Sequence, residues 1–193
     1  MLRPAVFLDR DDTLIENATL PPESWAGGRH GDLCDPRFVA PLAGAVGACR
    51  SLARAGYCLV VVSNQGLVAR GHGSIDQVEA TNAAMRREFV DDLGRGLLAA
   101  VYYCPWHPGG RVPEFTREHP WRKPAPGMLL AAAGALGLDL ARSWAIGDKP
   151  RDLEAGRRAG IAPDRLLMVG PGMGMDQAAE AIEKAGSAQS IGR

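Results

Sequence analysis

Five short apolar runs, spaced along the whole chain, constrain the fold more than any other feature of the sequence. They span residues 5–9 (AVFLD), 58–63 (CLVVVS), 98–104 (LAAVYYC), 143–148 (SWAIGD) and 165–170 (RLLMVG). Each run is apolar at consecutive positions instead of at every second position, which is typical of strands covered on both faces of a sheet. The runs therefore predict five buried strands.

Helical patterns separate these strands. They cover residues 44–56, 74–94, 125–137 and 150–160. In the second pattern, Ser74 and Gln77 have the spacing of a capping box, which marks a helix start. The same pattern places Val78, Met85, Phe89 and Leu93 along one apolar face. Alternating strands and helices predict a doubly wound, mainly parallel, Rossmann-like α/β sheet, which binds ligands at the carboxyl ends of its strands.

Length and composition predict one ordinary globular domain. The 193 residues suffice for one hydrophobic core and are too few for two ordinary domains. Basic and acidic residues number 22 each, so no overall field would recruit nucleic acid or a membrane surface. No apolar run reaches the roughly 18 residues of a membrane helix, and the N-terminus becomes acidic too early for a signal peptide. We expect a cytoplasmic monomer whose four cysteines are reduced thiols.

Two long segments interrupt the alternation of strands and helices. Residues 16–41 are rich in proline and glycine, and residues 105–124 contain five prolines. Loops of this length inside a compact domain are usually lids or binding loops, with disorder as the alternative. Residues 16–41, called the flap below, are therefore a candidate lid or binding loop.

Polar side chains follow the predicted strands. They are Asp9, Asp11, Ser63, Asn64, Asp148 and Asp152, with Lys123 just before a helix. Neighbouring carboxylates such as Asp9, Asp11 and Asp12 repel by about 1 kcal/mol at 4 Å in water and by more near a buried sheet, so a cation is needed. Carboxylates suit Mg²⁺, and carboxylates with a lysine suit phosphoryl transfer. A lone aspartate at a strand end is more commonly a turn former or a helix cap, which is our interpretation of Asp12.

Four segments carry a resemblance to a known family. They are FLDRDDT (7–13), VVSNQGLVARG (61–71), RKPAPGML (122–129) and IGDKPRDLEAGRRAG (146–160). In this order they resemble the motifs of the haloacid dehalogenase-like (HAD) phosphohydrolases. More narrowly, they resemble the minimally capped group that contains heptose bisphosphate and histidinol-phosphate phosphatases. The resemblance covers residues 5 to about 170 and implies a single HAD-like domain over residues 1–193 with no large cap domain.

The resemblance also implies roles for the residues that bind and transfer phosphate. Asp9 would be the nucleophile that forms an aspartyl-phosphate, and Asp11 would be the general acid and base. Ser63 and Asn64 would hydrogen-bond the phosphoryl group through hydroxyl, amide or backbone N–H. Lys123 would neutralise the phosphate oxygens and the aspartate.

A magnesium site is implied by the same motifs. Asp9, the backbone carbonyl of Asp11 and Asp148 would hold Mg²⁺. Asp152 and Lys149 would support these ligands from the second shell of contacts. Mg²⁺ is thus the cofactor that the resemblance implies.

The sequence departs from the family in the second long segment, residues 105–124. The related group carries a zinc loop there, with four ligands in a Cys-x-His and Cys-x-Cys arrangement. Here the matching positions hold Cys104, Trp106, His119 and Trp121. A structural zinc needs four nitrogen or sulfur ligands, so zinc requires that His107 shift in and a fourth ligand appear. We expect instead a degenerate loop in which the tryptophans pack where the metal would be.

Substrate selection is expected from the flap and from two arginines. Trp25, Arg29 and His30 are candidates in the flap, with an ordinary surface excursion as the alternative. Arg70 and Arg122 match substrate-contacting positions of the heptose enzymes, and arginine suits a second phosphate. Simple surface solvation is the competing explanation for both arginines.

These expectations favour Mg²⁺-dependent hydrolysis of a small sugar phosphate, with D-glycero-D-manno-heptose 1,7-bisphosphate as the leading substrate. Histidinol phosphate and other sugar or polyol phosphates are alternatives. A phospho-accepting receiver module, from a different functional class, is disfavoured because it has no acid at the position of Asp11. A catalytically dead binding protein is disfavoured because every expected catalytic position is filled.

Overall fold

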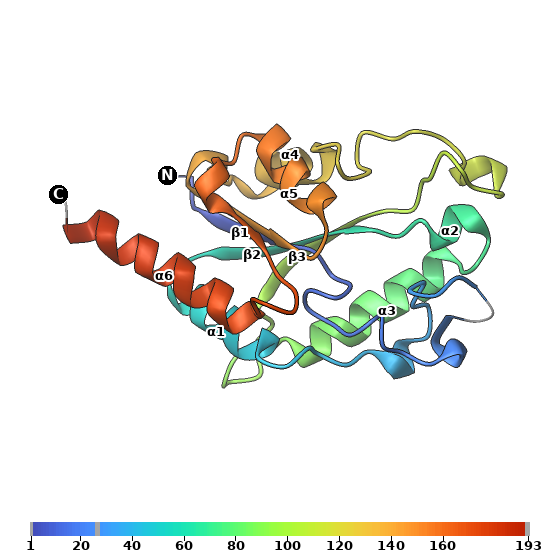
Figure 1. Ribbon diagram of the computed structural model, residues 1–193, viewed down its shortest axis with the longest axis horizontal. Coiled ribbons are helices and arrows are strands. Elements are labelled where there is room, and N and C mark those ends of the chain that lie inside the picture. The colour runs from blue at the N-terminus through green and yellow to red at the C-terminus, as the bar shows by residue number, and fades with distance from the viewer. Residues whose placement is uncertain (1, 26–27, 192–193) are drawn as a thin grey trace.

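The computed structural model describes residues 2–25 and 28–191, with side chains up to Ser187, and its centre is a five-stranded sheet (Figure 1). The strands are β1 (Ala5–Leu8), β2 (Cys58–Asn64), β3 (Leu98–Cys104), β4 (Trp144–Gly147) and β5 (Leu166–Met168). Their order is β3-β2-β1-β4-β5, and every neighbouring pair is parallel. The five predicted strands and the parallel α/β fold are confirmed.

Helices cover both faces of the sheet (Figure 1). They are α1 (Ala45–Arg54), α2 (Leu67–Arg70), α3 (Ile75–Glu88), α4 (Gly127–Leu136), α5 (Pro150–Ala159) and α6 (Met175–Ile191). Five single 3-10 turns are Pro22–Trp25, Pro36–Phe38, Pro113–Phe115, Leu140–Arg142 and Pro163–Arg165. Helices α1, α3 and α6 pack on one face of the sheet, and α4 and α5 on the other. No large cap domain is present among the described residues, as expected.

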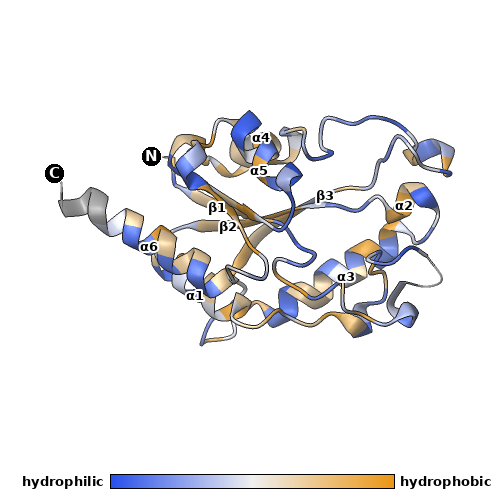
Figure 2. Ribbon diagram, viewed as in Figure 1, coloured by the Kyte–Doolittle hydropathy of each residue, from blue (hydrophilic) through white to orange (hydrophobic). Residues whose placement is uncertain are grey.

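Two apolar clusters form the core. Val6 and Leu8 of β1 pack toward α1, α3 and α6, whereas Ala5 and Phe7 pack toward α4 and α5. All four of these residues are at most 1% exposed. Because both faces are covered, consecutive positions of a strand are apolar. Figure 2 shows this apolar band through the strands, with hydrophilic residues on the outer faces of the helices.

Helix α3 begins where it was predicted to begin and ends earlier. The capping box is present, since Gln77 N–H donates to Ser74 Oγ at 3.2 Å and Ser74 N–H to Gln77 Oε1 at 2.9 Å. The helix stops at Glu88, and Asp91 then forms a turn by accepting the backbone N–H of Leu93 at 2.9 Å. The prediction that Leu93 lies on the buried face is wrong, because this turn leaves it 77% exposed.

Helices α2 and α6 were not anticipated. Helix α6 packs against α1 through an apolar side that includes Met175, Ala178 and Ile182. No helix in the described part of the chain is both long and apolar enough to cross a membrane.

Candidate active site

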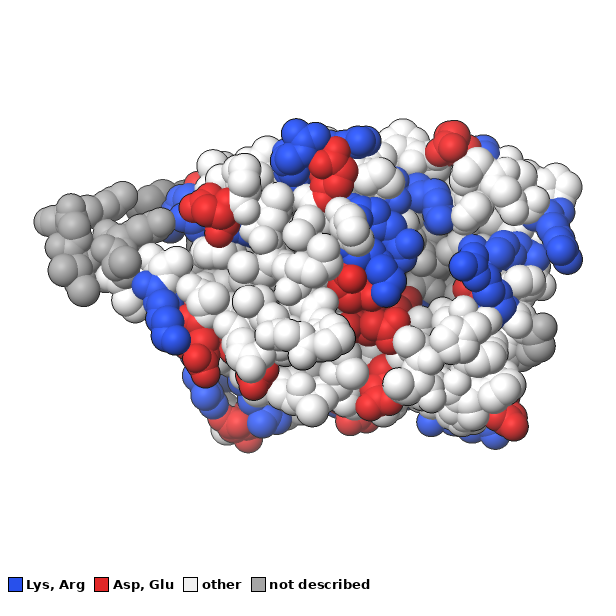
Figure 3. Space-filling view, viewed as in Figure 1, with Lys and Arg blue, Asp and Glu red and all other residues white. Residues whose placement is uncertain are grey.

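A pocket of about 390 Å³ opens beyond the carboxyl ends of β1, β2 and β4. The predicted residues that line it are Asp9, Asp11, Ser63, Asn64, Arg70, His107, Arg122, Asp148 and Lys149. Lys123 and Asp152 are buried beside it, at 3% and 5% exposure. Figure 3 shows acidic side chains gathered in a central hollow with basic side chains next to them. The structure thus brings the predicted catalytic, phosphate-binding and magnesium residues together.

A buried ammonium group joins two of the motifs. Lys123 Nζ lies 2.7 Å from Asp9 Oδ1 and 2.7 Å from Asp152 Oδ1, and it donates to the Val62 carbonyl at 2.7 Å. Burial lowers the pKa of Lys123, but Asp9 and Asp152 more than offset that effect, and the net pKa is raised. Lys123 is therefore a fixed positive charge beside Asp9.

The backbone of Lys123 is held by the end of β2. Asn64 Nδ2 donates to the Lys123 carbonyl, and Lys123 N–H donates to Asn64 Oδ1, both at 3.0 Å. The side-chain amide of Asn64 is thus used inside the protein. Ser63 Oγ accepts a hydrogen bond from Gln65 Nε2 at 2.8 Å, which leaves its own proton available to a ligand in the pocket.

Three carboxylates have the spacing of a metal site. Asp9, Asp148 and Asp152 each offer an oxygen, and these oxygens lie within 4.8 Å of one another. Burial raises the pKa of Asp148 to about 6, an effect that the ion pair with Lys149 opposes and Asp9 increases. Burial, with the charge of Asp9, also raises the pKa of Asp152. A divalent cation would relieve this excess negative charge, and an oxygen-only donor set suits Mg²⁺.

Asp11 belongs to a hydrogen-bond network that sequence reasoning missed. Arg10 Nε donates to Asp11 Oδ1 at 2.9 Å, and Gln65 Nε2 donates to Asp11 Oδ2 at 2.8 Å. Arg10 is fully buried, and its Nη1 donates to Asn82 of α3 at 2.9 Å. Burial raises the pKa of Asp11, with Arg10 opposing this rise. A basic residue inside the acidic run at 9–12 was the one available signal of this network.

Asp12 closes a tight turn at the start of the flap. Its φ is 57°, in the left-handed region that aspartate tolerates better than most residues. Its Oδ1 accepts the backbone N–H groups of Asn17 and Ala18 at 3.1 and 2.7 Å. Asp12 is thus a turn former, as interpreted from the sequence.

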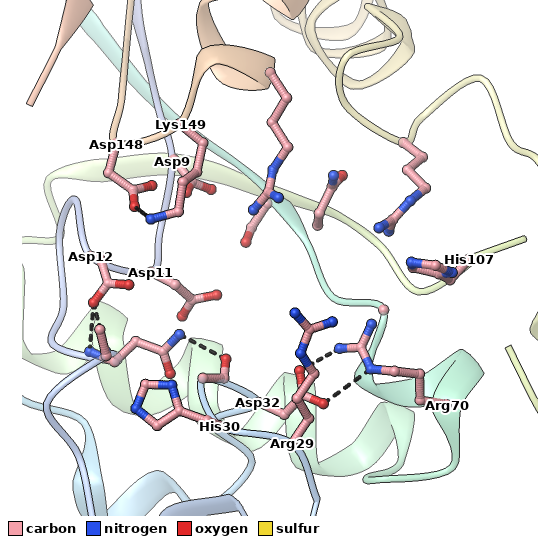
Figure 4. Close-up of a pocket in the computed structure, with 18 residues that line it drawn as sticks. Asp9, Asp11, Asp12, Arg29, His30, Asp32, Arg70, His107, Asp148 and Lys149 are labelled. Carbon is pink, nitrogen blue, oxygen red and sulfur yellow. Dashed lines mark hydrogen bonds and ion pairs between the residues drawn. The ribbon is translucent and has the colours of Figure 1, made fainter. Parts of the chain in front are cut away.

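The other end of the pocket is cationic. A Cβ atom placed on Gly66 would lie 2.9 Å from Arg70 Nη1, 3.3 Å from Arg122 Nη1 and 3.2 Å from the His107 ring. The two guanidinium groups and the imidazole therefore converge over a glycine, and a larger residue there would displace them. The acidic end and this cationic end lie on opposite sides of the pocket in Figure 4.

The predicted zinc-type positions are occupied by stacked rings. Trp106 stacks on His119 with ring centroids 3.8 Å apart, and the backbone N–H of Trp121 donates to His119 Nδ1 at 3.1 Å. Cys104 Sγ lies 3.6 Å from the Trp106 carbonyl, and His107 Nδ1 accepts the backbone N–H of Gly109 at 2.9 Å. Within the described residues, the only His, Cys, Asp or Glu cluster with metal spacing is the aspartate trio. The donors of this loop do not fit a tetrahedral zinc.

The flap contributes Arg29 and His30 to the pocket lining. Trp25 does not line the pocket but packs edge-on against the His30 ring, with centroids 4.6 Å apart. The flap also supplies Asp32, a buried acid that sequence reasoning did not single out.

Comparisons with known proteins agree with this geometry. The HAD-hydrolase-like family model matches residues 120–188. The D-glycero-beta-D-manno-heptose-1,7-bisphosphate 7-phosphatase of Yersinia pestis is 36% identical over 168 residues, which cover 86% of this chain and 81% of that enzyme. The chain belongs to the HAD-like phosphatases. The Vibrio cholerae enzyme of the same name is 34% identical over 170 residues, or 88% of this chain and 84% of the relative.

Solved structures of HAD-like phosphatases share the fold. A protein described as a HAD-like phosphatase from Mesorhizobium loti has a TM-score of 0.76 and 31% identity, covering 95% of this chain and 87% of that one. The D,D-heptose 1,7-bisphosphate phosphatase of B. bronchiseptica, complexed with magnesium and phosphate, has a TM-score of 0.72 and 23% identity. The superposition covers 95% of this chain and 99% of that enzyme, so the two proteins share the same fold.

Proposed function

We propose that this phosphatase uses Mg²⁺ to remove the 7-phosphate of D-glycero-β-D-manno-heptose 1,7-bisphosphate. The observation that carries the proposal is the placement of Lys123 Nζ between Asp9 and Asp152, with Asp148 completing the carboxylate trio. This arrangement supplies a nucleophile, a fixed cation and metal ligands within a few ångströms. We expect the enzyme to act as a monomer in the cytoplasm.

Asp9 is the nucleophile in this proposal. Its carboxylate attacks phosphorus, the bond to the sugar oxygen breaks, and an aspartyl-phosphate forms and is then hydrolysed. Lys123 neutralises charge on the transferring group and holds Asp9 in place, and Ser63 donates to a phosphate oxygen. When bound by Asp9, Asp148 and the backbone of Asp11, Mg²⁺ supplies further charge neutralisation at the phosphate.

Asp11 carries the proton. It protonates the leaving sugar oxygen in the first step and accepts a proton from the attacking water in the second. Burial raises the pKa of Asp11, which is the direction that a general acid requires. Arg10 and Gln65 fix the orientation of its carboxylate.

The cationic end of the pocket favours a substrate with a second phosphate. Arg70 and Arg122 present guanidinium groups there, beside Arg29 of the flap. Guanidinium groups bind phosphate through paired, charge-assisted hydrogen bonds. Histidinol phosphate would instead bring an ammonium group and an imidazole toward these cations, so this alternative is disfavoured by charge.

The test is phosphate release from the heptose bisphosphate by the purified protein. We expect Mg²⁺-dependent release of one phosphate per sugar, with the 1-phosphate as product. Asp9→Asn is expected to lower the rate by roughly a thousandfold or more. Asp35→Asn is the matched control, because Asp35 pairs with Arg37 at the surface of the flap.

Two outcomes would contradict the proposal. Activity that survives Asp9→Asn would refute the mechanism. Hydrolysis of p-nitrophenyl phosphate without hydrolysis of the heptose bisphosphate would leave the mechanism standing and overturn the substrate.

A further inference from the structure

Hydrogen bonds within the flap and with the turn before it hold the flap in place beside the pocket. Asp12 accepts two backbone N–H groups where the flap begins, and Asn17 Nδ2 donates to the Gly31 carbonyl at 2.7 Å. Residues 28–32 therefore have a defined position next to the cationic end of the pocket (Figure 4).

Asp32 makes the strongest of these attachments. Its side chain is 8% exposed and forms an ion pair with Arg70, whose Nε lies 3.1 Å from Oδ2 and whose Nη2 lies close to Oδ1. His72 Nδ1 lies 2.9 Å from the same Oδ2. One flap carboxylate thus holds two residues that follow the phosphate-binding motif at the end of β2.

This pairing determines which part of Arg70 faces the ligand. Nε and Nη2 are committed to Asp32, and among the described residues Nη1 has no hydrogen-bond acceptor. Nη1 is also the atom nearest to the space that Gly66 leaves open. Without Asp32, the long arginine side chain would lose this fixed orientation, which costs rotamer entropy to restore on binding.

We propose that Asp32 is a positioning residue that sets specificity for bisphosphorylated substrates, because it aims Arg70 Nη1 at the second phosphate. The inference rests on the proposed function and adds a residue to it: the flap acts on the substrate through Arg70 and not only as a cover. The competing explanation is that Asp32 merely keeps the flap folded.

The test compares KM for the heptose 1,7-bisphosphate with KM for p-nitrophenyl phosphate, which has no second phosphate. In Asp32→Asn, KM for the bisphosphate divided by KM for p-nitrophenyl phosphate should rise about tenfold. This is the size of effect expected when one charge-assisted contact is lost. Asp35→Asn, the same change at the surface acid of the flap, should leave the ratio unchanged. A ratio that stays within twofold of wild type in a folded Asp32→Asn protein would overturn the inference.

A double-mutant cycle separates positioning from folding. If Asp32 acts through Arg70, Asp32→Asn should have no further effect on the KM ratio in an Arg70→Ala background. A structural role of Asp32 would produce the same loss in both backgrounds, which would overturn the inference. If Asp32→Asn fails to fold, Arg70→Lys takes its place, because lysine keeps the charge but not the paired contact with Asp32. Arg70→Lys should raise the KM ratio in the same way, and an unchanged ratio would overturn the inference.

Binding measurements keep this test independent of the proposed substrate. The heptose bisphosphate and the heptose 7-phosphate are compared as competitors of p-nitrophenyl phosphate hydrolysis. Absence of bisphosphate turnover refutes the proposed function, whereas an equal inhibition constant for the bisphosphate in wild type and Asp32→Asn refutes the inference.

Discussion

Lys123 shows how a charged side chain can be fully buried when its partners are fixed. Removing an ammonium group from water is costly, and two carboxylates and a carbonyl offset that cost here. The reciprocal hydrogen bonds from Asn64 fix the backbone that carries it. The proposed catalytic geometry and the stability of this part of the core therefore depend on the same residue.

Replacing Lys123 by methionine should destabilise the protein as well as inactivate it. The change leaves Asp9 and Asp152 buried without their cation, and we expect the free energy of unfolding to fall by about 3–5 kcal/mol. Urea unfolding in the presence of a chelator measures this loss. Lys184→Met is the control, because Lys184 is exposed in a surface pair with Glu180. Equal stability of the two variants would show that the buried pair is not structural.

The carboxylate trio predicts a pH-dependent response to Mg²⁺. The pKa of Asp148 is raised from its ordinary value of 3.8 to about 6 in the folded state. Its contribution to stability therefore falls as the pH rises from the ordinary pKa to the raised one, and is lowest above the raised pKa. Mg²⁺ needs the ionised carboxylate and relieves the repulsion. The rise in Tm on adding Mg²⁺ should thus be larger at about pH 7.5 than at about pH 5. A rise that is equal at both values would contradict this account.

Sequence reasoning located the residues at strand ends but not their partners. The meeting of Asp9 and Asp148 was predictable because parallel strands bring their carboxyl ends together, whereas Lys123 was placed there by the resemblance to the HAD motifs. The contacts of Arg10 with Asn82 and of Asp32 with Arg70 join positions 72 and 38 residues apart. Such pairs follow from the packing of α3 and of the flap and leave no local pattern in the sequence.

At the scale of elements, local signals marked helix starts better than helix ends. The Ser74 capping box was predictable because its two partners lie three residues apart. The end of α3 was not, because the turn at Asp91 competes with a periodic apolar pattern that continues to Leu93. Helix α6 was missed because glycine and serine near the C-terminus weaken its pattern, and its packing on α1 stabilises it.

Removing the capping box of α3 should destabilise the protein modestly. Ser74→Ala loses the acceptor for the Gln77 N–H, and we expect a decrease of about 1 kcal/mol in the free energy of unfolding. Because α3 carries Asn82, the partner of Arg10, the rate of hydrolysis is a second readout. Ser51→Thr in α1, which retains the hydroxyl group, is the control for general tolerance to substitution in a helix. A loss well below half a kcal/mol would show that the cap is dispensable.

The aromatic loop should fold without zinc. The rings of Trp106 and His119 stack face to face, where a zinc site would need free ligands. We therefore expect metal analysis of the purified protein to find well under one zinc per chain. We also expect a zinc chelator to leave Tm unchanged. Trp106→Ala removes the stack and should cost about 2 kcal/mol or more of stability. One tightly bound zinc per chain would overturn this interpretation.

At the scale of the whole molecule, both faces of the sheet are covered within one chain. Among the side chains that the structure describes, the large apolar ones that remain exposed are Leu2, Leu93, Leu130 and Met168. Scattered apolar residues of this kind are normal on a monomer surface. The residues that line the pocket come from strand ends and loops spread along the chain.

We therefore predict a monomer in solution. Light scattering during size-exclusion chromatography should give the mass of one 193-residue chain at micromolar concentration. A stable dimer would contradict the prediction.

The clamp between Asn64 and Lys123 has a consequence for how such enzymes diversify. It fastens the catalytic end of the 105–124 loop to the sheet, independently of what fills the interior of that loop. Substitutions can therefore accumulate in the rest of the loop while the Lys123 ammonium keeps its position. The outer rim of the 105–124 loop is thus the part of this pocket wall where new ligand contacts can evolve, because the Asn64 amide holds the backbone of Lys123 in place.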